Sequence, residues 1–148
     1  MSLDLAAFRE AWQSQIKAKT DGSDRPLGVY GWERGNMATP CVFLRRGQIQ
    51  YHVTFAPPGH TTTAWEMVLR VSANQDEDAH RATDDYCATG TSCSLIDAVN
   101  ADVTLGGVVG SFVVKGAGQP GWNAAPDGSR DWLETVFACE MQQSGVTA

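Results

Sequence analysis

The sequence predicts an α+β fold: one antiparallel β-sheet of about five to six strands, packed by an N-terminal helix and a central helical block. Segments with alternating apolar and polar residues are grouped before and after a stretch with helical periodicity. Strands grouped in this way, instead of alternating with helices, are typical of α+β proteins. The 148 residues fit a single domain over 1–148, with 144–148 as a loose tail.

The N-terminal segment is the first predicted helix, near residues 4–18. Asp4 can cap its N-terminus, and Lys17 and Lys19 lie in its last turn, where cations suit the helix dipole. Four apolar residues recur at helical spacing and form one stripe: Leu5, Phe8, Trp12 and Ile16. We expect this stripe to pack on the sheet, with Phe8, Trp12 and Ile16 buried.

The next part of the chain predicts strands near 27–32, 41–44, 48–55 and 62–71. We interpret 41–44 and 48–55 as a hairpin whose tip is Arg45–Gln48, because the alternation starts again after the basic Gly-containing turn. The period of two places these residues on the buried face: Ile49, Tyr51, Val53, Trp65, Met67 and Leu69.

A change of period marks the helical block. Asn74 and Glu77 have capping-box spacing at the start of a helix near 75–88. The inner face of that helix is Ala79, Ala82 and Tyr86. Ser92 can cap a second, short helix that carries Leu95, Ile96 and Val99. Strands near 108–115 and 132–142 complete the sheet, and the glycines and prolines of 116–128 predict a long loop between them.

Composition excludes several classes of protein. Lys and Arg total 11 and Asp and Glu total 17, a net charge of −6 without a basic block, which argues against a dedicated nucleic-acid binder. No apolar run approaches the ~20 residues of a membrane span. The N-terminus lacks the basic region of a signal peptide, so we expect an intracellular protein without a membrane partner.

The cysteines do not have metal-site spacing. Cys41, Cys87, Cys93 and Cys139 are separated by 46, 6 and 46 residues, whereas zinc sites show close ligand pairs. We expect thiols buried in strands and at helix ends, with no disulfide, no metal and no cofactor.

The remaining polar residues do not form a recognisable catalytic pattern. His52, His60 and His80 are not spaced as metal ligands on a helix. The carboxylates fit a helix N-terminus and a solvated face: Asp76, Glu77, Asp78, Asp84 and Asp85. No G-x-S-x-G elbow is present, and the glycines from Gly116 onward do not open a helix. We assign no catalytic residue and expect a protein that is not an enzyme, and a small enzyme with an unrecognised site is the alternative.

With no catalytic or metal-binding pattern found, the remaining candidates are residues that could contact another protein. Arg45 and Arg46 are the basic pair at the predicted hairpin tip, next to Gln48, and Trp122 lies in the middle of the predicted loop. Arginine and tryptophan are enriched at interfaces. A turn arginine can equally be solvated, and a loop tryptophan can fold back onto its own core. We name Arg45, Arg46, Gln48 and Trp122 as candidate interface residues.

The order of elements and several stretches resemble the tail terminator (tail completion) proteins of long-tailed bacteriophages, especially those of actinobacterial phages. The resemblance covers nearly the whole chain. The stretches are Val29–Gly31, Thr39–Val42, Gln50–Phe55, Leu69–Ser72, Gln75–Asp76, Gly90–Ile96 and Asp102–Gly107. The 116–128 segment has no counterpart motif.

The resemblance implies a structural protein of the virion, assembled in the host cytoplasm. Such proteins form a ring of six copies on the capsid-proximal end of the tail tube, which stops tube polymerisation. The partners implied are further copies of the chain, the major tail tube protein and a head-completion or neck protein. Genome DNA passes through the lumen without sequence-specific binding. Another neck, head-closure or head-tail joining protein is the nearest alternative.

Overall fold

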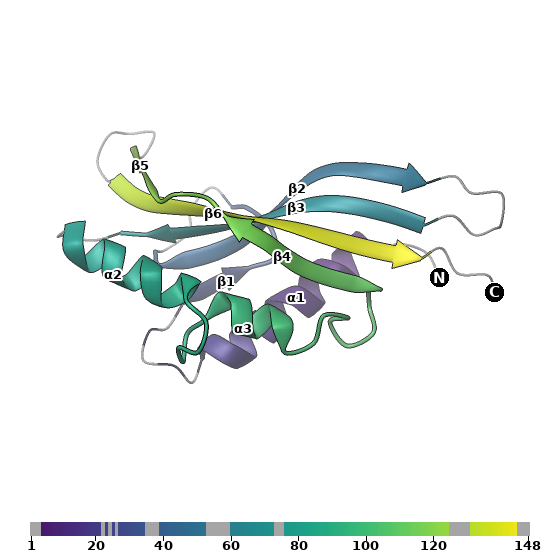
Figure 1. The fold of residues 1–148 in the computed structure, drawn as a ribbon, viewed down its shortest axis with the longest axis horizontal. Helices are drawn as coiled ribbons and strands as arrows, with labels where there is room; N and C mark the ends of the chain where they lie inside the picture. The colour runs from purple at the N-terminus through teal and green to yellow at the C-terminus, as the bar shows by residue number, and fades with distance from the viewer. Residues whose placement is uncertain are drawn as a thin grey trace.

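The computed structural model describes residues 4–21, 23, 25, 27–34, 39–52, 60–72, 76–124 and 131–144. The fold is α+β, as predicted, and the helices lie on one side of the sheet (Figure 1). The helices are α1 (Leu5–Thr20), α2 (Asp76–Cys87) and α3 (Leu95–Asn100). The strands are β1 (Gly28–Tyr30), β2 (Cys41–His52), β3 (His60–Val71), β4 (Ser111–Ala117), β5 (Gly121–Ala124) and β6 (Asp131–Ser144). None of the described helices is long and apolar enough to cross a membrane.

The sheet has the strand order β1-β2-β3-β6-β4, and β5 pairs with β6. All of these pairs are antiparallel except β1 with β2, which is parallel, with Val29 opposite Val42. The prediction of a wholly antiparallel sheet is therefore wrong at this one pair. Because β1 is only three residues long, the segment from Gly31 to Pro40 suffices to bring the chain back to the start of β2.

The predicted hairpin at Arg45–Gln48 is wrong. The chain runs straight through these residues as one strand, β2, whose pairing with β3 shifts between Arg46 and Ile49 in a β-bulge. Gly47 makes the bulge possible, because a Cβ atom there would lie 2.9 Å from the carbonyl oxygen of Ala64. The connection from β2 to β3 falls at 53–59, outside the described residues.

The core lies between the helices and the sheet. Phe8, Trp12 and Ile16 of α1 are fully buried, and the Phe8 ring lies 4.7 Å from the Trp65 ring and 5.3 Å from the Phe112 ring, centroid to centroid. Trp65, Met67 and Leu69 are buried as predicted.

The predicted register of the long strands is correct. Gln50 is exposed, whereas Ile49 is only half-buried, because this end of β2 extends past α1 (Figure 1). The side chain of Tyr51 and all of Val53 lie outside the described residues. On β6 the alternate residues Leu133, Phe137 and Met141 are buried on the same side.

Helix ends follow the sequence with one correction. The Asp4 side chain accepts a hydrogen bond from the N–H of Ala7, as expected of an N-cap. The N-cap of α3 is Ser94 and not Ser92: the Ser94 hydroxyl accepts from the N–H of Asp97, and the turn before it is closed by a bond from Ser94 N–H to Thr91 O. The predicted inner face of α2 is confirmed, with Ala79, Ala82 and Tyr86 buried. Asn74 lies outside the described residues.

Candidate functional site

The basic pair predicted at a hairpin tip does not form one patch. Successive residues of a strand point to opposite faces of the sheet. Arg45 is opposite Glu66 on the face without helices, whereas the exposed Arg46 is opposite Trp65 on the helix-covered face. Gln48 is exposed and lines a hollow on the helix-free face.

The structure places Trp122 in a strand and not in a loop. The segment expected as a loop over 116–128 contains the end of β4 and all of β5, whose Trp122 is opposite Leu133 of β6. The Trp122 side chain therefore lies on the helix-covered face, where its ring meets His80 of α2 edge-on at 6.2 Å. It remains 42% exposed. Trp122 is not brought together with Arg45, Arg46 or Gln48, because β3 and β6 separate β5 from β2.

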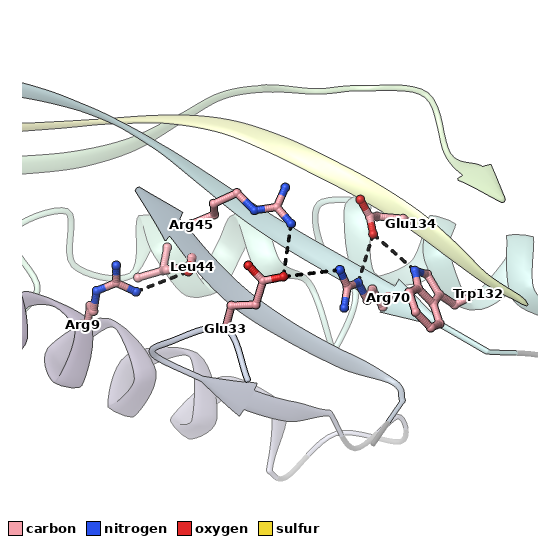
Figure 2. A network of polar contacts seen from close by, with 7 residues as sticks. All are labelled: Arg9, Glu33, Leu44, Arg45, Arg70, Trp132 and Glu134. Atoms are coloured by element: carbon pink, nitrogen blue, oxygen red, sulfur yellow. Dashed lines mark hydrogen bonds and ion pairs between the residues drawn. The ribbon is translucent and has the colours of Figure 1, made fainter. Parts of the chain in front are cut away.

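No pattern in the sequence signalled a polar network that the structure shows on the helix-free face. The guanidinium of Arg70 in β3 lies 4.8 Å from the ring centroid of Phe43 and 4.7 Å from that of Trp132. Figure 2 shows Arg70 beside Trp132 and Glu134. The Arg70 Nε donates to Oε2 of Glu134 at 3.0 Å, and Trp132 Nε1 donates to the same oxygen at 3.3 Å. The Arg70 and Glu134 side chains are only 17% and 15% exposed.

Glu33 joins Arg45 to this network. Its Oε1 lies 3.8 Å from Nη2 of Arg70 and 3.5 Å from Nη2 of Arg45, as Figure 2 shows. The candidate residue Arg45 is thus an outer member of an ion-pair network rather than an isolated charge. The alternation placed Arg70 on the polar face of its strand, but it gave no sign that the partner is Glu134, 64 residues further along.

A shallow hollow of about 680 Å³ lies on the same face, over the middle of β3 and β6. Its lining includes the small side chains Ala64 and Ala138, with longer polar side chains around them. Glu140 is paired with Lys115, Nζ to Oε2 2.7 Å, and this hydrogen bond lowers the pKa of Glu140. The lowered pKa keeps Glu140 charged at neutral pH, so this carboxylate is not poised to act as a general acid.

The Arg9 side chain bridges the residue after the short strand β1 and the edge of β2. Its Nη1 donates to the carbonyl oxygens of Gly31 at 2.6 Å and Leu44 at 3.3 Å, the latter drawn in Figure 2. Its guanidinium also lies over Trp65 and Trp32, at 4.8 Å and 5.5 Å from the ring centroids. Burial lowers the pKa of Arg9, and the charge of Arg46 lowers it further. Beyond this point β3 is the only described strand that pairs with β2.

The cysteines are free thiols placed as the sequence predicted, in strands and near helix ends. Cys41 begins β2, Cys139 lies in β6, and Cys87 ends α2. Cys93 is buried in the turn before α3. Burial raises the pKa of Cys41 and Cys87 to about 11 and that of Cys139 to about 12, so these three thiols are protonated at neutral pH.

The histidines and carboxylates are dispersed. His60 was expected in a loop but begins β3, where it pairs with His52 of β2; the side chains of both lie outside the described part. His80, Glu77, Asp78 and Asp84 are exposed on α2, as expected of a solvated face. Across the described part of the chain, no group of three or more His, Cys, Asp or Glu side chains could hold a metal ion.

Comparison with known proteins does not add a family. No protein-family model matches the chain. A search of curated proteins likewise found no match.

Proposed function

We propose that this chain is a tail terminator of a long-tailed bacteriophage, a structural virion protein and not an enzyme. Six copies form a ring on the capsid-proximal end of the tail tube, stop its polymerisation and offer the surface to which the head is joined. The ring contacts the major tail tube protein on one side and a neck protein on the other. The resemblance in sequence over nearly the whole chain is the first support for this proposal.

The observation that carries the ring is that, among the described strands, the sheet ends in two different open edges. One edge is β4 after Phe112, whose own N–H donates to Val103 O, and the other is the half of β2 that follows Arg9's contact at Leu44. Open strand edges are templates for pairing with another chain, and proteins normally protect them. A contact between two unlike surfaces of identical copies is head-to-tail, and such contacts form a ring when the rotation closes.

Further surface is left for the tube and the neck. The helices cover one face of the sheet, so the opposite face, with the Arg70 network and the hollow, is available to a different partner. The net charge of −6 is compatible with a lumen through which DNA passes, because phosphates are bound mainly by clustered Lys and Arg.

Tail length in a phage that lacks this protein tests the proposal. We expect overgrown tails of variable length that do not join heads, and normal, joined tails when the protein is supplied again. Electron microscopy of the virion then locates the chain. Tails of normal length in the absence of the protein would overturn the proposal, and density at the portal instead of the tube end would identify a head-closure protein.

A further inference from the structure

We infer that neighbouring copies join by antiparallel pairing of β4 of one copy with the free half of β2, Arg46–His52, of the next. The occupant of this open edge is thus a second copy of the same chain. The inference rests on the proposed ring and names the surfaces that close it.

Strand direction permits this pairing. The strands β2, β3, β6 and β4 are neighbours in that order, and each pair is antiparallel. β4 therefore runs opposite to β2. When β4 of one copy lies beside β2 of another, the alternation continues across the boundary, so one sheet extends through both copies.

Position along the sheet permits it as well. β1 pairs with Cys41–Phe43 only, which leaves the later part of β2 open. Val114 of β4 is opposite Cys139, Cys139 is opposite Trp65, and Trp65 is opposite Arg46. Val114 and Arg46 thus lie at the same level on the two edges. At this level a neighbouring β4 spans Leu44 to Gln50, so it overlaps the free half at Arg46–Gln50 and does not displace β1.

Backbone groups point outward at this level. The N–H of Phe112 donates to Val103 O at 2.7 Å, away from β6, so the N–H of Val114, two residues on, also points outward. On the other edge the carbonyl of Leu44 points outward to Arg9, and Arg46 has the same orientation two residues later. Pairing between copies would supply partners to both edges, as buried backbone groups require.

Side chains next to the two edges match. Exposed apolar side chains lie at both edges: Trp32, which precedes β2, is 41% exposed, and Val103, which precedes β4, and Val113 of β4 are each 37% exposed. Pairing between copies would remove apolar surface at both edges from water. The charges differ in sign: Arg46 is exposed on the β2 edge, and Asp102 next to Val103 is kept charged by hydrogen bonds, first from Thr104, that lower its pKa.

Crosslinking on assembled tails tests the pairing directly. Gln50→Cys and Val113→Cys place thiols on the helix-free face of the two edges, at exposed positions. With a short bismaleimide, the double variant should give a ladder of products that ends at six copies. Two controls should give no such ladder: each single variant, and a double variant with Gln50→Cys and Glu10→Cys, in which Glu10 is exposed on α1. These controls reveal any crosslinking through the native thiol of Cys87.

A proline substitution tests the outward N–H. Val114→Pro removes that donor at a bulge of an edge strand, where proline is tolerated, and Val114→Ala keeps it. We expect the proline variant to fold, with a melting temperature close to that of the alanine variant, but to lose ring formation and leave tails overgrown.

The two proposals can fail separately. Rings on tail ends without the Gln50–Val113 crosslink would overturn the pairing and leave the ring intact, even if Val114→Pro did not fold. Rings formed normally by a folded Val114→Pro variant would also contradict it. Tails without any ring of this protein would overturn both.

Discussion

The two faces of the sheet exclude water by different means. On one face, α1 lays Phe8, Trp12 and Ile16 against the strands. On the other face, Cys41, Phe43 and Val68 are fully buried without a helix above them. Around them lie long side chains of the sheet itself, above all Arg70 and Trp132.

The difference shows that ion-paired side chains with apolar stems can shield one face of a sheet from water in place of a helix. Arg70 covers Phe43 with its guanidinium, and its charge is balanced because Glu134 accepts a hydrogen bond from it and Glu33 forms an ion pair with it at 3.8 Å. Such a cover depends on its ion pairs, whereas the helix-covered face depends on apolar volume. Substitutions on the two faces should therefore lower the free energy of unfolding for different physical reasons.

The largest effect is expected on the helix-covered face. Phe137→Ala should lower the free energy of unfolding by about 3–5 kcal/mol, because a fully buried ring leaves a cavity. Urea unfolding measures this. Val136→Ala, the half-buried neighbour on the helix-free face, is the matched control and should cost much less. Equal losses would mean that the two faces are packed alike.

The second largest effect is expected from removing the Arg70 side chain, which covers the helix-free face. Arg70→Ala should lower the free energy of unfolding by about 2–3 kcal/mol, because the Glu134 carboxylate loses its main partner while it stays shielded from water. Arg70→Lys keeps the charge but loses the stacking between Phe43 and Trp132, so we expect an intermediate loss. A lysine variant as stable as the original protein would show that charge alone forms the cover.

The bulge that keeps Gln50 on the helix-free face is more tolerant. Gly47→Ala should cost about 1–3 kcal/mol of unfolding free energy, because the added Cβ meets the backbone oxygen of Ala64. Gly116→Ala, at the shift in β4, is the control, since nothing lies within 4 Å of a Cβ there. Similar losses in the two variants would contradict the steric explanation.

The smallest effect compares one thiol from each face as pH rises. Burial raises the pKa of Cys41 to about 11 and of Cys139 to about 12, so the folded state keeps protons that the unfolded state loses above pH 9. The contribution of these thiols to the free energy of unfolding is therefore fully present below pH 9. It declines above pH 9, by about 1 kcal/mol per thiol at pH 10. Cys41→Ala and Cys139→Ala should each flatten the decline in unfolding experiments. If only Cys139→Ala does so, water reaches Cys41 on the helix-free face.

Gly47 shows where prediction from the sequence stopped. The alternation before and after it was read correctly as strand, and Gln50 lies on the predicted face. A glycine between two such runs fits a hairpin turn and a bulge equally well. The choice depends on Ala64 in the next strand, whose backbone approaches Gly47 too closely for any side chain.

The predictions for the candidate interface residues also reached a limit. Arg46, Gln48 and Trp122 are exposed, but they lie in strands and not in the hairpin tip and the loop that the sequence predicted, and their separation onto different faces and strands was not predicted either. The Arg70–Glu134 pair was also out of reach, because it exists only when β3 and β6 are in register. A polar residue on an exposed strand face gives no signal of its partner.

The sequence alone determined the buried faces of α1, α2, β3 and β6. The stripe on α1 and the period of two on β3 and β6 do this locally, because side-chain periodicity follows from backbone geometry. Only the tertiary structure decided that β1 joins β2 in parallel, that β2 is bulged and that Arg70 meets Glu134. These features depend on pairing between segments far apart in the chain, and a local pattern does not contain that register.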